Sequence, residues 1–135
     1  MEKYPLQLRE YYFPTQIAQA NPEFDPEGDL HGTKIKLSFN FFKGDKSGQV
    51  WLADMSVETD EAESVNPPYF FEIQAFGVFQ SDDEADEQII LSVGQIACNQ
   101  ILTGAIRERL ADLTSRGPWG QHLLNIIPIK IKPQP

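Results

Sequence analysis

The spacing of apolar residues changes once along this chain of 135 residues, near residue 86. Before that point, apolar and polar residues alternate in four segments, the pattern of strands with one buried face. Beyond it, apolar residues recur every three or four positions, as they do along a helix. Strands followed by a single helix predict an α+β domain in which the helix packs on one face of the sheet.

The four predicted strands span about residues 4–13, 33–42, 49–59 and 69–80. The second has the clearest alternation, with one face formed by Ile35, Leu37, Phe39 and Phe41. The third has a similar face, formed by Trp51, Ala53, Met55 and Val57. The fourth carries large apolar residues on both faces. Short connections between the last three segments favour an antiparallel meander, hence a four-stranded antiparallel sheet.

Residues 14–32 separate the first two strands and contain five residues that interrupt regular structure: Pro14, Pro22, Pro26, Gly28 and Gly32. This composition predicts a long crossover loop over the whole of 14–32. A loop of this length in a compact domain is usually functional or connects distant elements.

The predicted helix spans about residues 86–115, with acidic residues at its start and Arg107, Arg109 and Arg116 at its end. These charges complement the helix dipole, and Gly117-Pro118 ends the helix. Its apolar stripe is predicted to comprise Ile90, Val93, Ala97, Ile101 and Ala105, flanked by Leu102, Ile106, Leu110 and Leu113. The remainder, 118–135, is a short apolar tail within one single domain.

The net charge of −9 argues against nucleic acid or anionic lipid as a partner, since both attract basic surfaces. No uninterrupted apolar run approaches the roughly 20 residues of a bilayer span, so no membrane insertion is expected. Residues 1–5 are not followed by the apolar core of a secretory signal. Cys98, the single cysteine, is predicted to be a buried, inert thiol, and a reducing cytoplasm is the expected location.

Enzymatic motifs are absent from the sequence. His31 and His122 do not have metal-ligand spacing, and Gly44–Gly48 resembles a phosphate loop but precedes a strand. The acidic runs 58–63 and 82–87 lack the spacing of a calcium loop. We therefore expect no enzyme activity and no cofactor; an enzyme or small-ligand binder built on an oligomeric sheet is the least favoured alternative.

Apolar surface is the unusual feature of this chain. One helix covers one face of the sheet, so Phe42 and Leu52 would add to an uncovered apolar face. Apolar residues also lie beyond the main stripe of the helix, at Ile89, Leu91, Ile96 and Leu102. Such surface predicts contacts within a homo-oligomer, or a groove that accepts apolar stretches of another polypeptide.

Three segments resemble the SecB family of bacterial export chaperones: Tyr69–Phe79, Ala97–Leu110 and Thr114–Trp119. The similarity extends from about Leu6 to Pro128 and includes the order of the predicted elements. It implies an ATP-independent holdase that binds unfolded or precursor polypeptides in the cytoplasm, assembled as a homotetramer, a dimer of dimers, with the long helices at subunit contacts. The positions that match its client-binding grooves are Phe24, Leu37, Phe39, Trp119, Leu123 and Leu124.

In the SecB family, acidic residues on the flat sheet face bind the SecA translocase ATPase, and Phe70 and Glu72 match one such docking position. Two further acidic positions of the family correspond here to Gln16 and Ala20. The second helix and the acidic tail of the family are not found in 129–135. These departures leave a second interpretation open, a specialised SecB-like adaptor or chaperone for a single partner such as an antitoxin, not coupled to the export motor.

Overall fold

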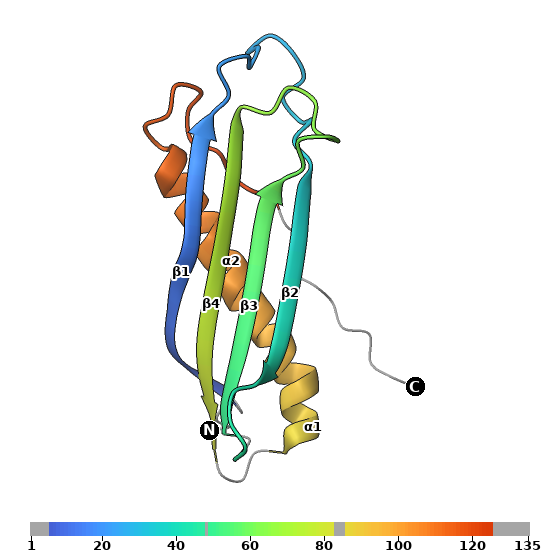
Figure 1. Cartoon of the computed structure of the whole chain (residues 1–135), viewed down its shortest axis with the longest axis vertical. Coiled ribbons are helices and arrows are strands. Elements are labelled where there is room, and N and C mark those ends of the chain that lie inside the picture. Colours follow the sequence, from blue (N-terminus) through green and yellow to red (C-terminus); the bar gives the residue numbers. More distant parts are fainter. Residues whose placement is uncertain (1–5, 48, 83–85, 126–135) are drawn as a thin grey trace.

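The computed structural model describes residues 6–47, 49–82 and 86–125. Four strands come first: β1 (Leu6–Ala20), β2 (Ile35–Lys43), β3 (Val50–Thr59) and β4 (Tyr69–Ser81). A continuous helical segment follows, made of α1 (Glu87–Ile89), the π-helical turn η1 (Ile90–Gly94) and α2 (Gln95–Thr114). The strands form one antiparallel sheet in the order β1-β4-β3-β2, and the helix crosses one face of it diagonally (Figure 1). This confirms the predicted fold class.

The first strand is longer than predicted. It continues to Ala20, so the expected loop over 14–32 was wrong for its first seven positions and begins at Asn21. Pro14 is tolerated because β1 is an edge strand, and the register with β4 shifts between Tyr12 and Thr15 to accommodate it. The predicted start of this strand at residue 4 lies outside the described residues.

The loop after β1 must pass from one edge of the sheet to the other, because β1 and β2 are the two outer strands. Asn66, between β3 and β4, holds it in place. Its side-chain amide donates to the carbonyl oxygens of Asp25 and Asp29, both at 2.9 Å, and its Oδ1 accepts from the Asp25 N–H at 2.8 Å. Asn66 has a φ of 55°, a conformation that asparagine tolerates better than most residues.

The core lies between the sheet and the helix. The predicted inner face of β3 is confirmed, since Trp51, Ala53, Met55 and Val57 are all buried. The helix stripe was predicted incorrectly in part, because Val93 and Ile101 are exposed. The helical residues that face the sheet are Ile90, Cys98, Leu102, Ile106 and Leu110.

The segment Glu87–Thr114 is long and apolar enough to cross a membrane by length and composition alone. In this fold it packs on β4, β3 and β1 instead. Leu102, Ile106 and Leu110 are completely buried there, as in the core helix of a soluble protein.

Candidate polypeptide-binding site

Two of the predicted client-binding residues lie on β2, where the helix-side face of the sheet is incompletely covered. Leu37 is 37% exposed, whereas Val57, its neighbour across the β2–β3 ladder, is fully buried. Phe39 is half-buried and packs against the core. The difference arises because the helix lies over β4, β3 and β1, which leaves the β2 side of this face less protected.

The segment after the helix supplies two more predicted residues beside the start of β2. Leu123 and Leu124 line a pocket of about 290 Å³ together with Ile35 and the crossover residues Leu30 and Thr33. Leu123 is 69% exposed and is the most accessible of the six predicted client contacts.

Leu124 is buried, and its carbonyl oxygen accepts a hydrogen bond from Arg107 Nε at 3.0 Å. In this arrangement its side chain belongs to the core and offers little surface to a client. The hydrogen bond from Arg107 thus holds the backbone at residue 124 against the helix, while the side chain of Leu123 remains exposed to solvent.

The remaining two predicted residues, Phe24 and Trp119, meet where the crossover loop contacts the segment after the helix. Their ring centroids are 5.2 Å apart with an interplanar angle of 55°. The Trp119 indole donates to the carbonyl oxygen of Asn21 at 2.9 Å. Both aromatic rings remain half-buried, so they form a second apolar surface at the loop end of the sheet.

Tyr69 positions this aromatic pair. Its hydroxyl donates to the Gly120 carbonyl oxygen at 2.6 Å and accepts from the Trp119 N–H at 3.2 Å. Gly117 lies close to the Tyr69 side chain, and a Cβ at residue 117 would collide with the hydroxyl and the adjoining ring atoms. The glycine that ends the helix is therefore required here by packing as well.

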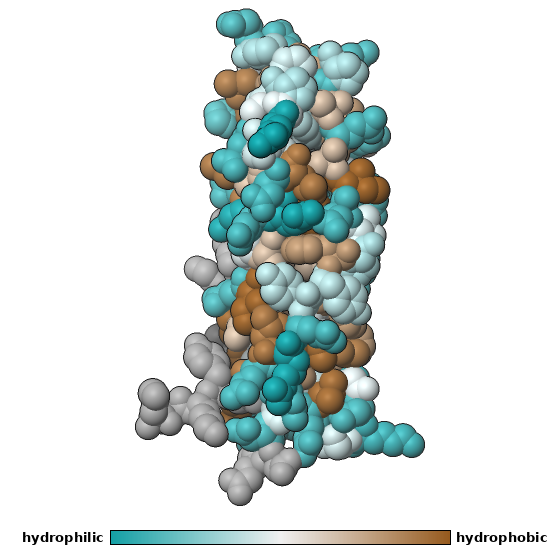
Figure 2. Space-filling model, turned by 90° about the vertical axis from the view of Figure 1, so that its left-hand side faces the viewer, coloured by the Kyte–Doolittle hydropathy of each residue, from teal (hydrophilic) through white to brown (hydrophobic). Residues whose placement is uncertain are grey.

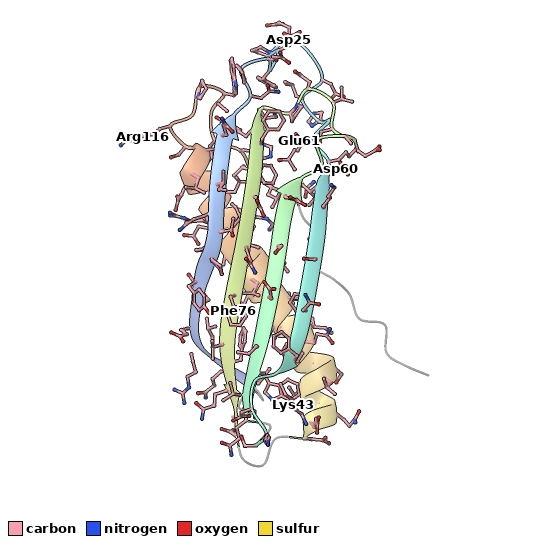
Figure 3. All side chains as sticks on the ribbon, in the orientation of Figure 1. Asp25, Lys43, Asp60, Glu61, Phe76 and Arg116 are labelled. Atoms are coloured by element: carbon pink, nitrogen blue, oxygen red, sulfur yellow. The ribbon has the colours of Figure 1, made fainter. Side chains whose placement is uncertain are left out.

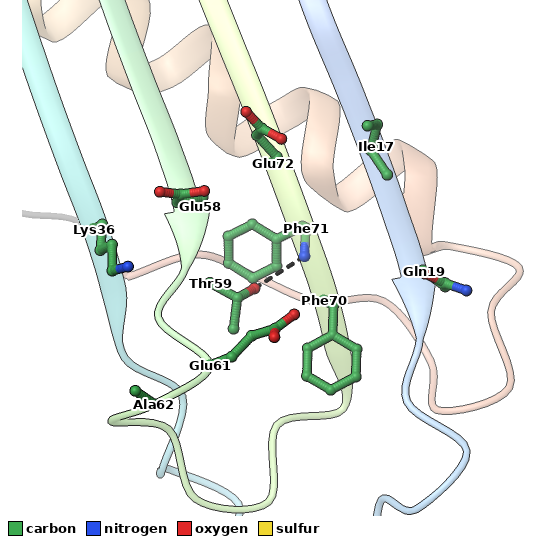
Figure 4. Close-up of a pocket in the computed structure, with 10 residues that line it drawn as sticks. All are labelled: Ile17, Gln19, Lys36, Glu58, Thr59, Glu61, Ala62, Phe70, Phe71 and Glu72. Carbon is green, nitrogen blue, oxygen red and sulfur yellow. Dashed lines mark hydrogen bonds between the residues drawn. The ribbon is translucent and has the colours of Figure 1, made fainter.

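The predicted motor-docking residues, Phe70 and Glu72, lie on the sheet face opposite the helix. They line a pocket of about 470 Å³ at the loop end of that face (Figure 4). Glu58 lies directly across the ladder from Glu72, and Glu61 also lines the pocket. Sequence reasoning found Glu72 alone, because the cross-strand register that brings Glu58 beside it is a property of the folded sheet.

Gln16 and Ala20, the positions where the SecB family has acidic residues, do not reach this face. Gln16 lies opposite Ile73 in the β1–β4 register and accepts a hydrogen bond from Arg109 of the helix at 2.5 Å. Ala20 packs against the core. Both therefore face the helix, and the β1 residue beside Glu72 is Ile17.

Acidic residues lie at both ends of the sheet, and at one of them Glu87 forms an ion pair with Lys43. Asp25, Asp60 and Glu61 lie at the loop end of the sheet, far from Lys43 (Figure 3). Over the residues that the structure describes, no group of three or more His, Cys, Asp or Glu side chains is arranged to hold a metal ion.

Cys98 faces the sheet, as predicted for a buried thiol. Burial raises the pKa of Cys98 to about 12, which keeps the sulfur protonated at neutral pH. His122 packs against the rings of Phe71 and Tyr69, with centroids 5.7 and 6.2 Å away. Its burial lowers the pKa of the imidazole.

The outer side of the helix forms another apolar surface, with Ile89, Val93 and Ile101 exposed. Viewed from the β1 edge, several apolar patches lie along the molecule, separated by hydrophilic residues (Figure 2). Isolated exposed apolar residues are ordinary, whereas larger exposed apolar patches usually mark an interface.

Comparison with solved structures identifies the architecture. The structure superposes on the SecB-like chaperone Rv1957 from Mycobacterium tuberculosis, solved in complex with a ChAD peptide from the Rv1956 HigA1 antitoxin, with a TM-score of 0.57 and 16% sequence identity. The match covers 94% of both chains. The fold is SecB-like.

A second match is a Streptococcus agalactiae protein, with a TM-score of 0.51, 10% identity and coverage of 90% of this chain and 97% of that one. No protein-family profile matches the sequence. No curated protein matches it significantly either. This chain therefore shares its SecB-like architecture with the mycobacterial chaperone at low sequence identity.

Proposed function

We propose that this protein is a SecB-like, ATP-independent holdase that binds non-native polypeptides in the cytoplasm. The observation that carries the proposal is incompletely covered apolar surface at Leu37, Phe39 and Leu123 on a SecB-like fold. The Phe24–Trp119 pair supplies a second apolar contact on the same chain. Several weak contacts on one client raise its affinity through effective concentration and require little sequence specificity.

The proposal is tested by light scattering of reduced insulin, which aggregates as its chains separate. We expect the protein to delay aggregation without ATP, and Leu123→Ser to weaken the delay. Val65→Ser is the matched control, since Val65 is also strongly exposed but lies in the β3–β4 loop. Unchanged aggregation at molar excess of the wild-type protein would disprove the holdase function.

A specialised role is the second candidate, favoured by the antitoxin peptide bound to the structurally similar mycobacterial chaperone. In this case the same apolar surfaces would serve one dedicated polypeptide partner. Affinity capture from native lysate separates the two roles, because a single stoichiometric partner indicates the specialised role and many substoichiometric partners indicate a general holdase.

We further propose that the chain assembles as a homotetramer through the outer side of its helix, where Val93 and Ile101 are exposed. Ile101→Lys is expected to lower the mass measured by sedimentation, because a charge would be buried in the contact. Ile17→Lys, on the opposite sheet face, is the control. A wild-type protein that sediments as a monomer would contradict this assembly.

Docking of the SecA motor through Phe70 and Glu72, and a role in protein export, are proposed for the sheet face opposite the helix. Glu58 and Glu61 add negative charge beside Glu72, which favours a basic partner surface. Titration with purified SecA tests this docking, and wild-type protein that shows no binding at low salt would exclude it.

A further inference from the structure

The sheet face opposite the helix changes character along its length. Residues that pair across neighbouring strands point to the same face, so the strand registers divide this face into rows. The row near the loop end is charged and consists of Lys36, Glu58 and Glu72. Six residues farther along each strand, the corresponding row is apolar and consists of Phe42, Leu52 and Val78.

The apolar end of this face extends beyond one row. Phe76, in the adjoining row, packs against Tyr12 of β1 with ring centroids 5.4 Å apart. Phe42 is 45% exposed and Tyr12 is 50% exposed, whereas the other members of the group are half-buried. We call the whole group the distal patch: Tyr12, Phe42, Leu52, Phe76 and Val78. Exposed apolar patches usually mark contact surfaces.

The other end of the face carries excess negative charge. Its pocket is lined by three carboxylates and one ammonium group, from Glu58, Glu61, Glu72 and Lys36 (Figure 4). Between the two ends, Asp54 accepts a hydrogen bond from the Gln74 side chain at 2.9 Å, so its carboxylate has a partner within the sheet. Basic groups of a partner would therefore be attracted to the pocket end, and apolar groups to the distal patch.

The geometry of the face restricts what can bind to it. Backbone hydrogen bonds form at the edges of a sheet, so a partner meets this face through side chains alone. The described helix packs on the other face and leaves this one uncovered (Figure 1). A helix presents side chains of one kind along a stripe and commonly forms the next layer on a sheet. Six residues of strand span about 20 Å, which about 13 residues of helix also span.

We propose that this face binds an amphipathic helix of a partner protein, with apolar side chains on the distal patch and basic side chains about 20 Å away, over Glu58 and Glu72. A purely basic partner, bound at Glu72 alone, would leave the distal patch uncovered. The inference is independent of the holdase function, which uses the opposite face. It also does not depend on whether the partner is the export motor.

The probe is a fluorescent helical peptide of about 18 residues, with Leu along one stripe of its first half and Arg along the same stripe of its second half. We expect fluorescence anisotropy to show binding that weakens as salt is raised, because salt screens the basic end. A peptide of the same composition, with Leu and Arg mixed along the stripe, should bind about tenfold more weakly. A photo-crosslinker at the Leu end should label the distal patch, as identified by mass spectrometry.

The matched protein variants are Phe42→Ser and Leu37→Ser, which lie on opposite faces of β2. The two side chains are 45% and 37% exposed. Phe42→Ser should weaken peptide binding about tenfold and leave the delay of insulin aggregation unchanged. Leu37→Ser should weaken the delay and change peptide affinity by less than about twofold. If Phe42→Ser does not fold, the crosslinked residues of the wild type still decide.

Three outcomes would overturn helix docking on this face. Equal affinity for the two peptides would show that the face does not distinguish an apolar end from a basic one. Loss of peptide binding in Leu37→Ser, but not in Phe42→Ser, would show that the peptide binds on the client side of the sheet. A lower sedimenting mass of Phe42→Ser would show that a second copy of the chain covers the distal patch. The holdase function would stand in each case if the wild type still delays aggregation.

Discussion

The two faces of the sheet differ in the residues that the same strands present. Toward the helix, β3 and β4 present an uninterrupted apolar surface, where Trp51, Ile73 and Phe79 are almost completely buried. On the opposite face, carboxylates alternate with aromatic and aliphatic residues, as in the pairing of Glu72 with Glu58 and the contact of Phe76 with Tyr12 at 5.4 Å. The first face stabilises the fold, whereas the second combines solubility with surface available for contacts.

Deleting one aromatic ring from each face is the strongest way to test this difference. Phe79 is 1% exposed and lines the helix side, whereas Phe76, on the same strand, lies half-buried on the other. Phe79→Ala should lower the free energy of unfolding by about 3–5 kcal/mol because it leaves a cavity. Phe76→Ala should cost about 1 kcal/mol. Urea denaturation measures both, and equal losses would show that the two faces are equally important for stability.

Removing a tyrosine hydroxyl from each face is expected to give a smaller difference in stability between the two faces. Tyr69→Phe removes the hydrogen bonds to Gly120 and Trp119 from a buried group and should cost about 1–3 kcal/mol. Tyr12→Phe, exposed on the opposite face, should change stability by less than about 0.5 kcal/mol. Thermal unfolding of the two variants compares them. A negligible effect of Tyr69→Phe would mean that water replaces the missing hydroxyl.

His122 makes the helix side sensitive to acid. Its pKa is lowered in the folded state by burial, so as pH falls below the ordinary value of 6.5 the unfolded chain takes up the proton first. Stability contributed by neutral His122 is therefore lost as pH falls from 6.5 through the folded pKa, at no more than about 1.4 kcal/mol per pH unit. We expect His122→Gln to flatten the decline between pH 7 and 5, as measured by urea denaturation. His31→Gln, at an exposed loop position, should keep the steeper decline; equal curves would contradict the assignment to His122.

The smallest expected effect lies on the outward face. Glu72 and Glu58 are like charges directly across a ladder, so Glu72→Gln should stabilise the protein by about 0.2–0.5 kcal/mol at low salt. High salt should remove the difference, because it screens exposed charges. Adding Glu58→Gln tests the pairing, since the second substitution should give no further gain of this kind. Full additivity of the two changes would argue against repulsion between them.

The buried face of a strand was predictable where apolar and polar residues alternate, because every second residue of a strand points to the same side of the sheet. Trp51 and Met55 were placed correctly for this reason. The helix was harder, since it is apolar around much of its circumference and periodicity could not distinguish buried Leu102 from exposed Ile101. An apolar pattern establishes that a helix has buried surface, but the neighbouring elements determine which side is buried.

The candidate site depended more on tertiary structure. The contact between Phe24 and Trp119 joins two loops far apart in sequence, and their grouping was expected only from the resemblance to SecB. The pairing of Glu72 with Glu58 requires the β3–β4 register. The continuation of β1 past Pro14 required knowing that β1 is an edge strand, since proline would interrupt a central one.

The strand order also predicts an order of events during folding. β2, β3 and β4 form a meander of neighbours, whereas β1 pairs with β4 only after the whole of β2 and β3 has been placed between them in the chain. Closing that long loop is entropically slower than forming local hairpins. In pulse-labelled hydrogen exchange we therefore expect amides of the β3–β4 ladder to gain protection before those of β1. In that order of events, one edge of β4 would stay open until β1 pairs with it, and the partly folded chain would resemble the non-native polypeptides proposed as clients.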